Sequence, residues 1–184
     1  MIGIVQVDAD KGQRLYQFTG DPQELSIITQ GIDSVAYFTW LNDTTVALAC
    51  LNNGMELYIY EVNNSQYVVL EKNIGRCLLR EPLLGDMIFT RKSGDNVTLV
   101  KYEMSTGESS TYVEGLSGVD DYVFNKEGKL LASKEGKLFM CDPNGDQKWN
   151  EMADFSKTIG TFYRIAASPD GKRLAVVSYK GKRP

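Results

Sequence analysis

Hydrophobic and polar residues near the C-terminus follow a pattern that predicts two short β-strands joined by a turn. Apolar positions flank Ser168-Pro169-Asp170-Gly171 within the stretch from Tyr163 to Val177. Proline fixes φ at about −65° in the second turn position, aspartate can bond its own backbone, and glycine adopts positive φ without steric cost. The apolar run from Leu174 to Val177 predicts that the second strand is buried on both faces.

Related strand–turn–strand patterns recur upstream at a nearly constant spacing. Three alternating strands, each followed by a polar turn, begin 42 and 39 residues apart, at Leu57, Leu99 and Leu138. A second series is offset from the first. Its members are Trp40, Phe124 and Ala167, which are 84 and 43 residues apart. Each of them precedes a polar turn that is followed by two apolar residues.

A period near 40 residues with four strands in each unit is typical of the blades of a β-propeller. An open β-sandwich is the alternative, since it also has short strands at regular intervals. A sandwich gives no reason for turn chemistry to repeat at a fixed period, so the propeller is favoured. We therefore predict an all-β fold: a partial or truncated β-propeller of four-stranded antiparallel blades, with about four blade equivalents.

The strand pattern divides the chain into blades within a single predicted domain, 1–184. Three full blades are expected at 32–73, 74–116 and 117–160, with partial blades at 1–31 and 161–184. The N-terminal strands could complete the last blade and close a four-bladed ring, which would leave Ile2–Asp8 as a surplus strand. No helix is required, although Leu83–Met87 and Glu151–Lys157 could each contain one helical turn.

Several segments, in their order and spacing, resemble TolB-type, WD-like six-bladed propellers of Bacteroidetes-type bacteria. The resemblance extends roughly from Ile4 to Lys180 and corresponds to the C-terminal two-thirds of such a propeller. The segments that carry it include Gln13–Tyr16, Val35–Trp40, Asp120–Phe124, Lys137–Trp149 and Arg164–Gly171. It implies a periplasmic or secreted protein, while a cytoplasmic location stays open because the first residues, Met1–Asp8, predict a strand and no signal peptide.

The chain departs from this pattern at positions where the resembling proteins often carry histidine. Phe38 stands at one of them, and Arg76, Cys77, Leu78 and Leu79 replace an Arg-Ser-x-His element. The resembling proteins also usually have a signal peptide and about two more N-terminal blades. If their histidines serve a site, that site is altered in this chain.

Composition and charge exclude several classes of function. The 184 residues carry a net charge of −4 with scattered Lys and Arg, which argues against a nucleic-acid surface. No run of 18 apolar residues is available for a transmembrane helix. The three cysteines, Cys50, Cys77 and Cys141, have neither zinc-site nor disulfide-framework spacing, and we interpret them as buried strand residues.

Catalytic and metal sites are disfavoured by the residues present. Without histidine, neither a Ser-His-Asp nor a Cys-His arrangement can exist. The carboxylate pairs Asp8/Asp10 and Asp120/Asp121 are interpreted as solvated loop residues. Asp142, Asn144 and Asp146 alternate as in a calcium loop, but Gln147 and Ala153 stand where glycine and glutamate are needed, so a polar hairpin turn is expected. We expect no cofactor and no metal.

Four residues are candidates for a binding site in the central channel of the propeller: Arg76, Arg164, Tyr37 and Phe38. The two arginines lie at innermost blade strands, where a guanidinium fork suits a carboxylate or phosphate. The alternative is that they bond carbonyl groups between blades. Tyr37, together with other inner-strand aromatics (Trp40, Tyr122, Phe124 and Tyr163), is also explained by packing between blades.

These observations favour a non-enzymatic scaffold that binds another protein or a small anionic ligand through loops on one face. Its exposed blade edges could also pair to form a homodimer. The alternative is the accessory propeller of a prolyl-oligopeptidase-like peptidase whose catalytic domain is absent from this chain.

Overall fold

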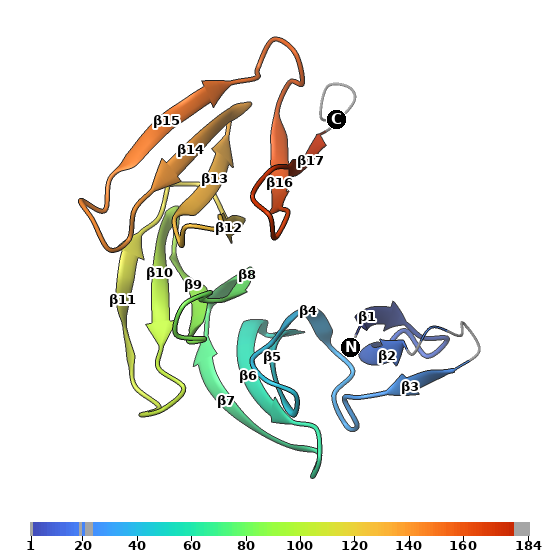
Figure 1. Ribbon diagram of the computed structural model, residues 1–184. Helices are drawn as coiled ribbons and strands as arrows, with labels where there is room; N and C mark the ends of the chain where they lie inside the picture. The colour runs from blue at the N-terminus through green and yellow to red at the C-terminus, as the bar shows by residue number, and fades with distance from the viewer. Residues whose placement is uncertain (1, 19, 21–23, 179–184) are drawn as a thin grey trace. The chain divides into compact units, whose positions relative to one another are not determined.

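The computed structural model describes residues 2–18, 20 and 24–178, and every regular element in these residues is a β-strand. Strands that follow one another in the chain pair antiparallel and form five sheets (Figure 1). The chain divides into two compact units, Met1–Leu78 and Leu79–Pro184. Within the described residues, no helix has the length and apolar character needed to cross a membrane.

The first unit contains a three-stranded sheet and a complete four-stranded sheet. The smaller sheet consists of β1 (Ile2–Val7), β2 (Gln13–Phe18) and β3 (Leu25–Ile27). The larger consists of β4 (Val35–Trp40), β5 (Thr45–Asn52), β6 (Gly54–Glu61) and β7 (Gln66–Lys72). Both sheets contribute to one hydrophobic core, whose members include Leu15, Val35, Val46, Leu48 and Tyr60.

The second unit begins within β8 (Ile74–Arg80), the first strand of another four-stranded sheet. This sheet continues with β9 (Met87–Ser93), β10 (Asn96–Tyr102) and β11 (Ser109–Glu114). The next sheet consists of β12 (Tyr122–Phe124), β13 (Leu130–Lys134), β14 (Lys137–Cys141) and β15 (Trp149–Asp154). The last two strands, β16 (Phe162–Ala167) and β17 (Leu174–Ser178), form a sheet of their own.

The same irregularity recurs in all three four-stranded sheets. Pairing between the third and fourth strands shifts after three leucines, Leu57, Leu99 and Leu138. The residues left out of the ladder on the fourth strands are Leu70, Tyr112 and Met152. Such a β-bulge bends the strand and increases its twist. These leucines are the ones that defined the first series in the sequence, so the period of about 40 residues corresponds to one repeated strand geometry.

The residues of the second series each end the first strand of a sheet. The turn predicted at Ser168–Gly171 is confirmed. Trp40, Phe124 and Ala167 end β4, β12 and β16. In the last turn, the Ser168 amide donates to the Arg173 carbonyl over 2.9 Å. Asp170 Oδ1 accepts hydrogen bonds from Ser168 Oγ (2.6 Å) and the Lys172 amide (3.0 Å), and Gly171 has a φ of 70°.

Side chains connect neighbouring sheets within the second unit. The indole Nε1–H of Trp149 on β15 donates to the carbonyl of Glu114 at the end of β11, over 2.8 Å. The Ser133 hydroxyl on β13 donates to the carbonyl of Phe162 on β16, over 3.0 Å. Adjacent sheets therefore share hydrogen bonds as well as apolar packing.

The burial predicted for Leu174–Val177 is wrong. These residues of β17 alternate between half-buried and exposed, and Val177 is 48% exposed. The reason is that β17 is the last described strand of a two-stranded sheet and has no outer strands beside it. In the complete sheet, the equivalent second strand β5 is buried from Thr45 to Cys50.

Neither of the two segments that could contain a helical turn forms a helix. After Glu81 the chain makes a single turn, closed by a 3.0 Å hydrogen bond from the Gly85 amide to the Glu81 carbonyl, and then enters β9. Glu151 to Asp154 belongs to β15, and a turn follows at 156–159. In both places short loops between strands leave no length for a helix.

The two terminal sheets, β1–β3 and β16–β17, are each incomplete. Closure of a four-bladed ring through them stays a prediction, as does the single domain 1–184. Residues 1, 19, 21–23 and 179–184, which fall in the predicted partial blades 1–31 and 161–184, lie outside the described residues.

Candidate functional site

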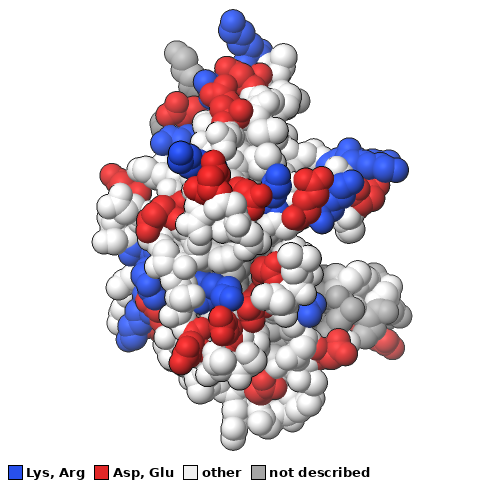
Figure 2. Space-filling view, turned by 60° about the vertical axis from the view of Figure 1, so that its left-hand side comes forward, with Lys and Arg blue, Asp and Glu red and all other residues white. Residues whose placement is uncertain are grey.

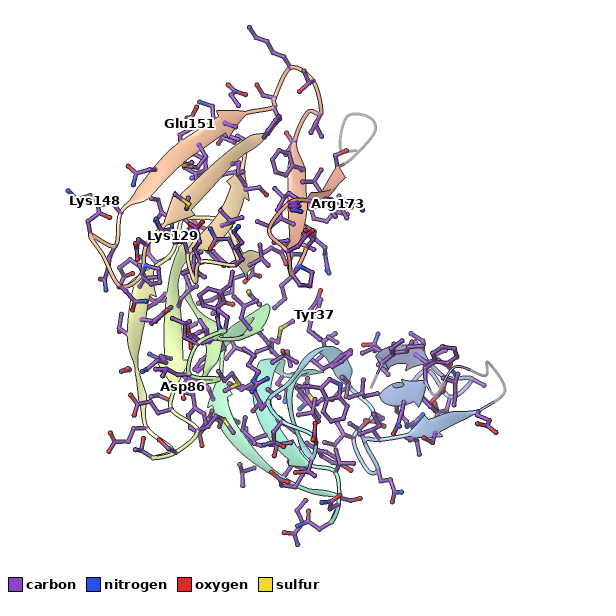
Figure 3. The ribbon with its side chains drawn as sticks, in the orientation of Figure 1. Tyr37, Asp86, Lys129, Lys148, Glu151 and Arg173 are labelled. Carbon is purple, nitrogen blue, oxygen red and sulfur yellow. The ribbon has the colours of Figure 1, made fainter. Side chains whose placement is uncertain are left out.

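The four predicted channel residues lie on the first strands of three sheets, and all are half-buried. Tyr37 and Phe38 belong to β4, Arg76 to β8 and Arg164 to β16 (Figure 3 labels Tyr37). Phe38 packs against the core of the first unit. Arg76 belongs to the first unit and Arg164 to the second. Ligand binding by these four residues stays a prediction.

The turn between β8 and β9, with the sequence Glu-Pro-Leu-Leu-Gly-Asp, is built around a buried carboxylate. Glu81 is only 5% exposed, and its Oε2 accepts hydrogen bonds from the amides of Leu83 and Leu84. The Glu81 amide donates to the Asp86 carbonyl over 2.7 Å, and Gly85 has a φ of 80°. Backbone and side chain of Glu81 thus both hold this turn closed.

This turn presents two leucine side chains to solvent. Leu83 is 72% exposed and Leu84 is 77% exposed, more than any other large hydrophobic residue in the described part of the chain. Single exposed apolar residues are ordinary on a protein surface. Leu83 and Leu84 are adjacent in the chain, and the hydrogen bonds from their amides to Glu81 fix the backbone that carries them.

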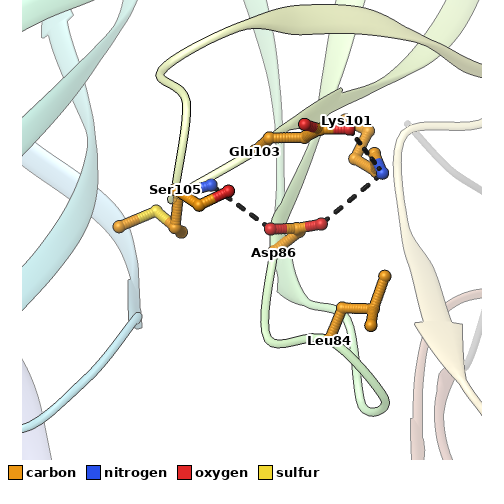
Figure 4. Close-up of a pocket in the computed structure, with 6 residues that line it drawn as sticks. Leu84, Asp86, Lys101, Glu103 and Ser105 are labelled. Carbon is orange, nitrogen blue, oxygen red and sulfur yellow. Dashed lines mark hydrogen bonds and ion pairs between the residues drawn. The ribbon is translucent and has the colours of Figure 1, made fainter.

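Leu84 borders an open pocket of about 350 Å³ that also contains charged groups (Figure 4). Asp86, which is buried, accepts a hydrogen bond from the Met104 amide (3.2 Å) and lies 3.5 Å from Lys101 Nζ. Lys101 also pairs with Glu103 at 3.0 Å. Two carboxylates around one ammonium group give the pocket a net negative charge, with the apolar side chains of Leu84 and Met104 at its wall.

The electrostatics of this pocket do not suit proton transfer by its amine. The hydrogen bond that Lys101 donates to Glu103 is the main cause that raises the pKa of Lys101 above its ordinary value, and nearby Asp86 adds to it. The ammonium group therefore stays charged at neutral pH and is unavailable as a general base. The pocket is better suited to binding than to acid–base chemistry.

A second hollow, of about 240 Å³, lies in the same unit and includes Lys92, Gly118 and Asp120. Asp120 pairs with Lys92 at 3.1 Å and accepts a hydrogen bond from Thr90 Oγ1 at 3.3 Å. The interpretation of Asp120 as a solvated loop residue is therefore wrong. The loop that precedes β12 brings this carboxylate against β9, where a cation and a hydroxyl group bind it.

Asp8 and Asp10 both contact Arg14, but only Asp8 is half-buried, whereas Asp10 is exposed to solvent as predicted. The guanidinium of Arg14 lies 2.7 Å from Asp8 Oδ2 and 2.7 Å from Asp10 Oδ2, and Tyr16 Oη donates to Asp8 over 2.8 Å. The hydrogen bond from Arg14 is the largest cause that lowers the pKa of Asp10 to about 2. These contacts connect the turn after β1 to β2, a structural role that the linear sequence did not indicate.

The three cysteines are buried, and the segment from Asp142 to Asp146 forms a hairpin turn, as predicted. Cys50, Cys77 and Cys141 are buried thiols. Asp142 Oδ1 accepts from the Asn144 amide and Asp146 Oδ1 from the Lys148 amide, so these side chains close a hairpin turn. Within residues 2–18, 20 and 24–178, no three His, Cys, Asp or Glu side chains are grouped to hold a metal ion.

Charged residues are mixed rather than segregated on the surface. Figure 2 shows Lys and Arg interspersed with Asp and Glu across the face in view, without one continuous basic area. This distribution agrees with the scattered Lys and Arg in the sequence.

No protein-family model and no curated protein match the chain. Among solved structures, TolB from Acinetobacter baumannii matches with a TM-score of 0.75 and 17% identity, over 98% of this chain and 47% of that one. An oligogalacturonate lyase from Vibrio parahaemolyticus matches with a TM-score of 0.65 and 13% identity, over 90% of this chain and 52% of that one. The extracellular domain of BT4673 from B. thetaiotaomicron matches with a TM-score of 0.62 and 15% identity, over 89% of this chain and 23% of that one.

These likenesses identify the fold as a partial β-propeller similar to that of TolB, as predicted. The chain spans about half the length of the first two proteins and about a quarter of the third. One of the three is named as a lyase, so the shared fold does not decide whether this chain is an enzyme.

Proposed function

We propose that this propeller segment is a non-enzymatic scaffold that binds another protein through the turn between β8 and β9. The observation that carries the proposal is the exposure of Leu83 and Leu84, at 72% and 77%, on a turn fixed by the buried carboxylate of Glu81. A loop held rigidly on a sheet pays little ordering entropy when it binds, which favours recognition of a partner.

The surroundings of the two leucines support one kind of partner. The adjoining pocket places Asp86 and Glu103 around Lys101, with Met104 beside Leu84. A segment that combines an apolar side chain with a lysine or arginine would cover the leucines and add a positive charge to the net negative pocket. We therefore expect the partner to be a protein with a short basic and apolar segment, rather than an anion.

The absence of enzymatic activity is part of the proposal and is supported by the state of the reactive groups. The sequence has no histidine. Burial raises the pKa of Cys50 to about 12 and that of Cys141 to about 11, so neither thiol is a ready nucleophile. The Asp8, Asp10 and Asp120 carboxylates are held by cations.

We further infer a location outside the cytoplasm. The support is the structural likeness to TolB and to the extracellular domain of BT4673. Fractionation of the cells that produce this protein, with the protein detected by antibody in the cytoplasmic and extracytoplasmic fractions, tests this inference, and recovery in the cytoplasmic fraction alone would overturn it.

Selection of peptides on the purified protein tests the binding function. A random peptide library displayed on phage is panned against the immobilised protein, and enriched peptides are measured by fluorescence anisotropy. We expect peptides with neighbouring apolar and basic residues, whose affinity falls about tenfold or more in the Leu83→Ser/Leu84→Ser double variant.

Met152→Ser is the matched control, because Met152 is a 52% exposed hydrophobic residue on β15 of the same unit. This variant should bind the selected peptides as the parent does. Failure to enrich any peptide, or equal binding by the double leucine variant, would overturn the proposal.

A further inference from the structure

The outer edge of β7, in the first unit, is another exposed apolar surface of the described chain. Three consecutive residues of this strand are large and exposed: Tyr67 (47%), Val68 (61%) and Val69 (45%). Tyr67 is fixed by stacking on Tyr58, with ring centroids 4.9 Å apart. As the last strand of its sheet, β7 has one side without a ladder partner among the described strands.

The repeated bulge makes the three outer strands directly comparable. Counted back from the bulged residues, Val69 is equivalent to Thr111 on β11 and Glu151 on β15, and Val68 is equivalent to Ser110 and Asn150. Each of these four counterparts is polar or charged and exposed. At these two equivalent positions, β7 has valines, whereas β11 and β15 have polar or charged residues.

Sheet edges are normally protected from pairing by charges, bulges or short strands. On β7 the bulge at Leu70 and the charges of Glu71 and Lys72 lie in the second half of the strand. The first half, from Gln66 to Val69, is uncharged and rich in β-branched and aromatic residues. This half keeps the properties of a strand that can accept another strand.

The outer edge of β7 does not wait for a fifth strand of its own blade. The sheet β4–β7 already has four strands, the full complement of a propeller blade. The other apolar edge of the unit, β1, differs in this respect because it belongs to an incomplete sheet.

We propose that β7 is a self-association surface, which pairs antiparallel with β7 of a second copy of the chain about a two-fold axis at Val68. This register places each Tyr67 opposite Val69 of the other copy, an aromatic and β-branched pair that stabilises antiparallel strands. Glu71 then lies opposite Ser65, and Lys72 opposite Asn64, so no like charges oppose one another. The strand is complementary to itself, as an isologous interface requires.

An interface made of one strand edge is small. Interfaces that bury less than about 1,200 Å² are weak and transient. We therefore expect a dimer whose population rises with protein concentration, rather than a permanent one.

Sedimentation velocity of the full chain at increasing concentration tests the proposal. The parent protein should shift from monomer toward dimer. Val68→Lys should remain monomeric at every concentration, because it places two ammonium groups opposite each other at the axis. The matched variant Ser110→Lys, at the equivalent exposed position of β11, should dimerise as the parent does.

Disulfide trapping tests the register separately. Val68→Cys should form a covalent dimer under mild oxidation, since facing residues of an antiparallel pair lie within disulfide reach, whereas Ser110→Cys should not. Circular dichroism of each variant verifies its fold. A parent protein that stays monomeric, or a Val68→Lys variant that still dimerises, would overturn the proposal. A monomeric parent would instead favour pairing of β7 with a strand of a different protein.

Discussion

The phenol hydroxyl of Tyr60 donates a 2.9 Å hydrogen bond to the main-chain carbonyl of Ile28. The same oxygen accepts a 3.1 Å hydrogen bond from the amide of Gln30. Tyr60 lies on β6 and is fully buried, while Ile28 and Gln30 follow β3 of the preceding sheet. One hydroxyl group therefore satisfies two backbone groups at the junction of the two sheets of the first unit.

Removal of this hydroxyl should destabilise the protein. Tyr60→Phe keeps the ring but leaves the Ile28 carbonyl and the Gln30 amide without this partner, which costs about 1–3 kcal/mol of unfolding free energy. Urea denaturation measures the effect. Tyr67→Phe is the control, because Tyr67 is 47% exposed and its hydroxyl can bond water. An equal loss in both variants would contradict the assigned role of Tyr60.

Glu81 should determine how rigid the turn between β8 and β9 is. Glu81→Ala removes the acceptor of the Leu83 and Leu84 amides, so their hydrogen exchange should become faster while exchange in β9 and β10 stays slow. We expect a loss of about 1–3 kcal/mol in unfolding free energy from the missing charged acceptor. Glu127→Ala, in an exposed turn of the same unit, should change neither quantity. Unchanged exchange at Leu83 and Leu84 would show that Glu81 does not hold the turn.

Acid should weaken the hairpin of β1 and β2. The pKa of Asp10 is lowered to about 2, mainly by the hydrogen bond from Arg14, whereas a free aspartate titrates at about 3.9. A depressed pKa in the folded state means that the stabilisation is complete above about pH 4 and disappears as the pH falls toward 2. Asp8 contributes in the same direction, because Arg14 also lowers its pKa.

The thermal midpoint, measured from about pH 5 down to about pH 2, should therefore fall less steeply in Arg14→Gln than in the parent. Added salt should reduce the difference, since these groups are near the surface. Identical pH profiles for the two proteins would contradict the role of Arg14.

Native thiols should react slowly with an aromatic disulfide reagent. Burial raises the pKa of Cys50 to about 12, so only about one thiol in 10⁴ is ionised near pH 8. Cys141 is raised to about 11 by the same cause. All three cysteines should react at once in guanidinium chloride, and an added exposed thiol, Ser110→Cys, should react promptly in the native protein. Rapid reaction of the unmodified native protein would show that the core opens readily.

Features that depend on local pattern could be predicted from the sequence. The polar turn at Ser168–Gly171 needs only a proline, an aspartate and a glycine in the right order, and the spacing of Leu57, Leu99 and Leu138 reports one strand position repeated in each blade. These features require no knowledge of distant residues. These two features could therefore be found from the sequence alone.

Features that depend on tertiary neighbours could not be predicted. The exposure of Val177 follows from the lack of outer strands beside β17, and the pairing of Asp120 with Lys92 joins residues 28 positions apart. The turn between β8 and β9 did leave a signal in the sequence. Turns are normally polar, so two leucines between Pro82 and Gly85 are an exception that could have identified the site.

The order of strands within each sheet has a consequence for how the chain is synthesised. Each antiparallel ladder joins strands that are consecutive in the chain, so the first pairing needs only a short loop to close. A nascent chain can therefore assemble β4–β7 while later residues are still on the ribosome.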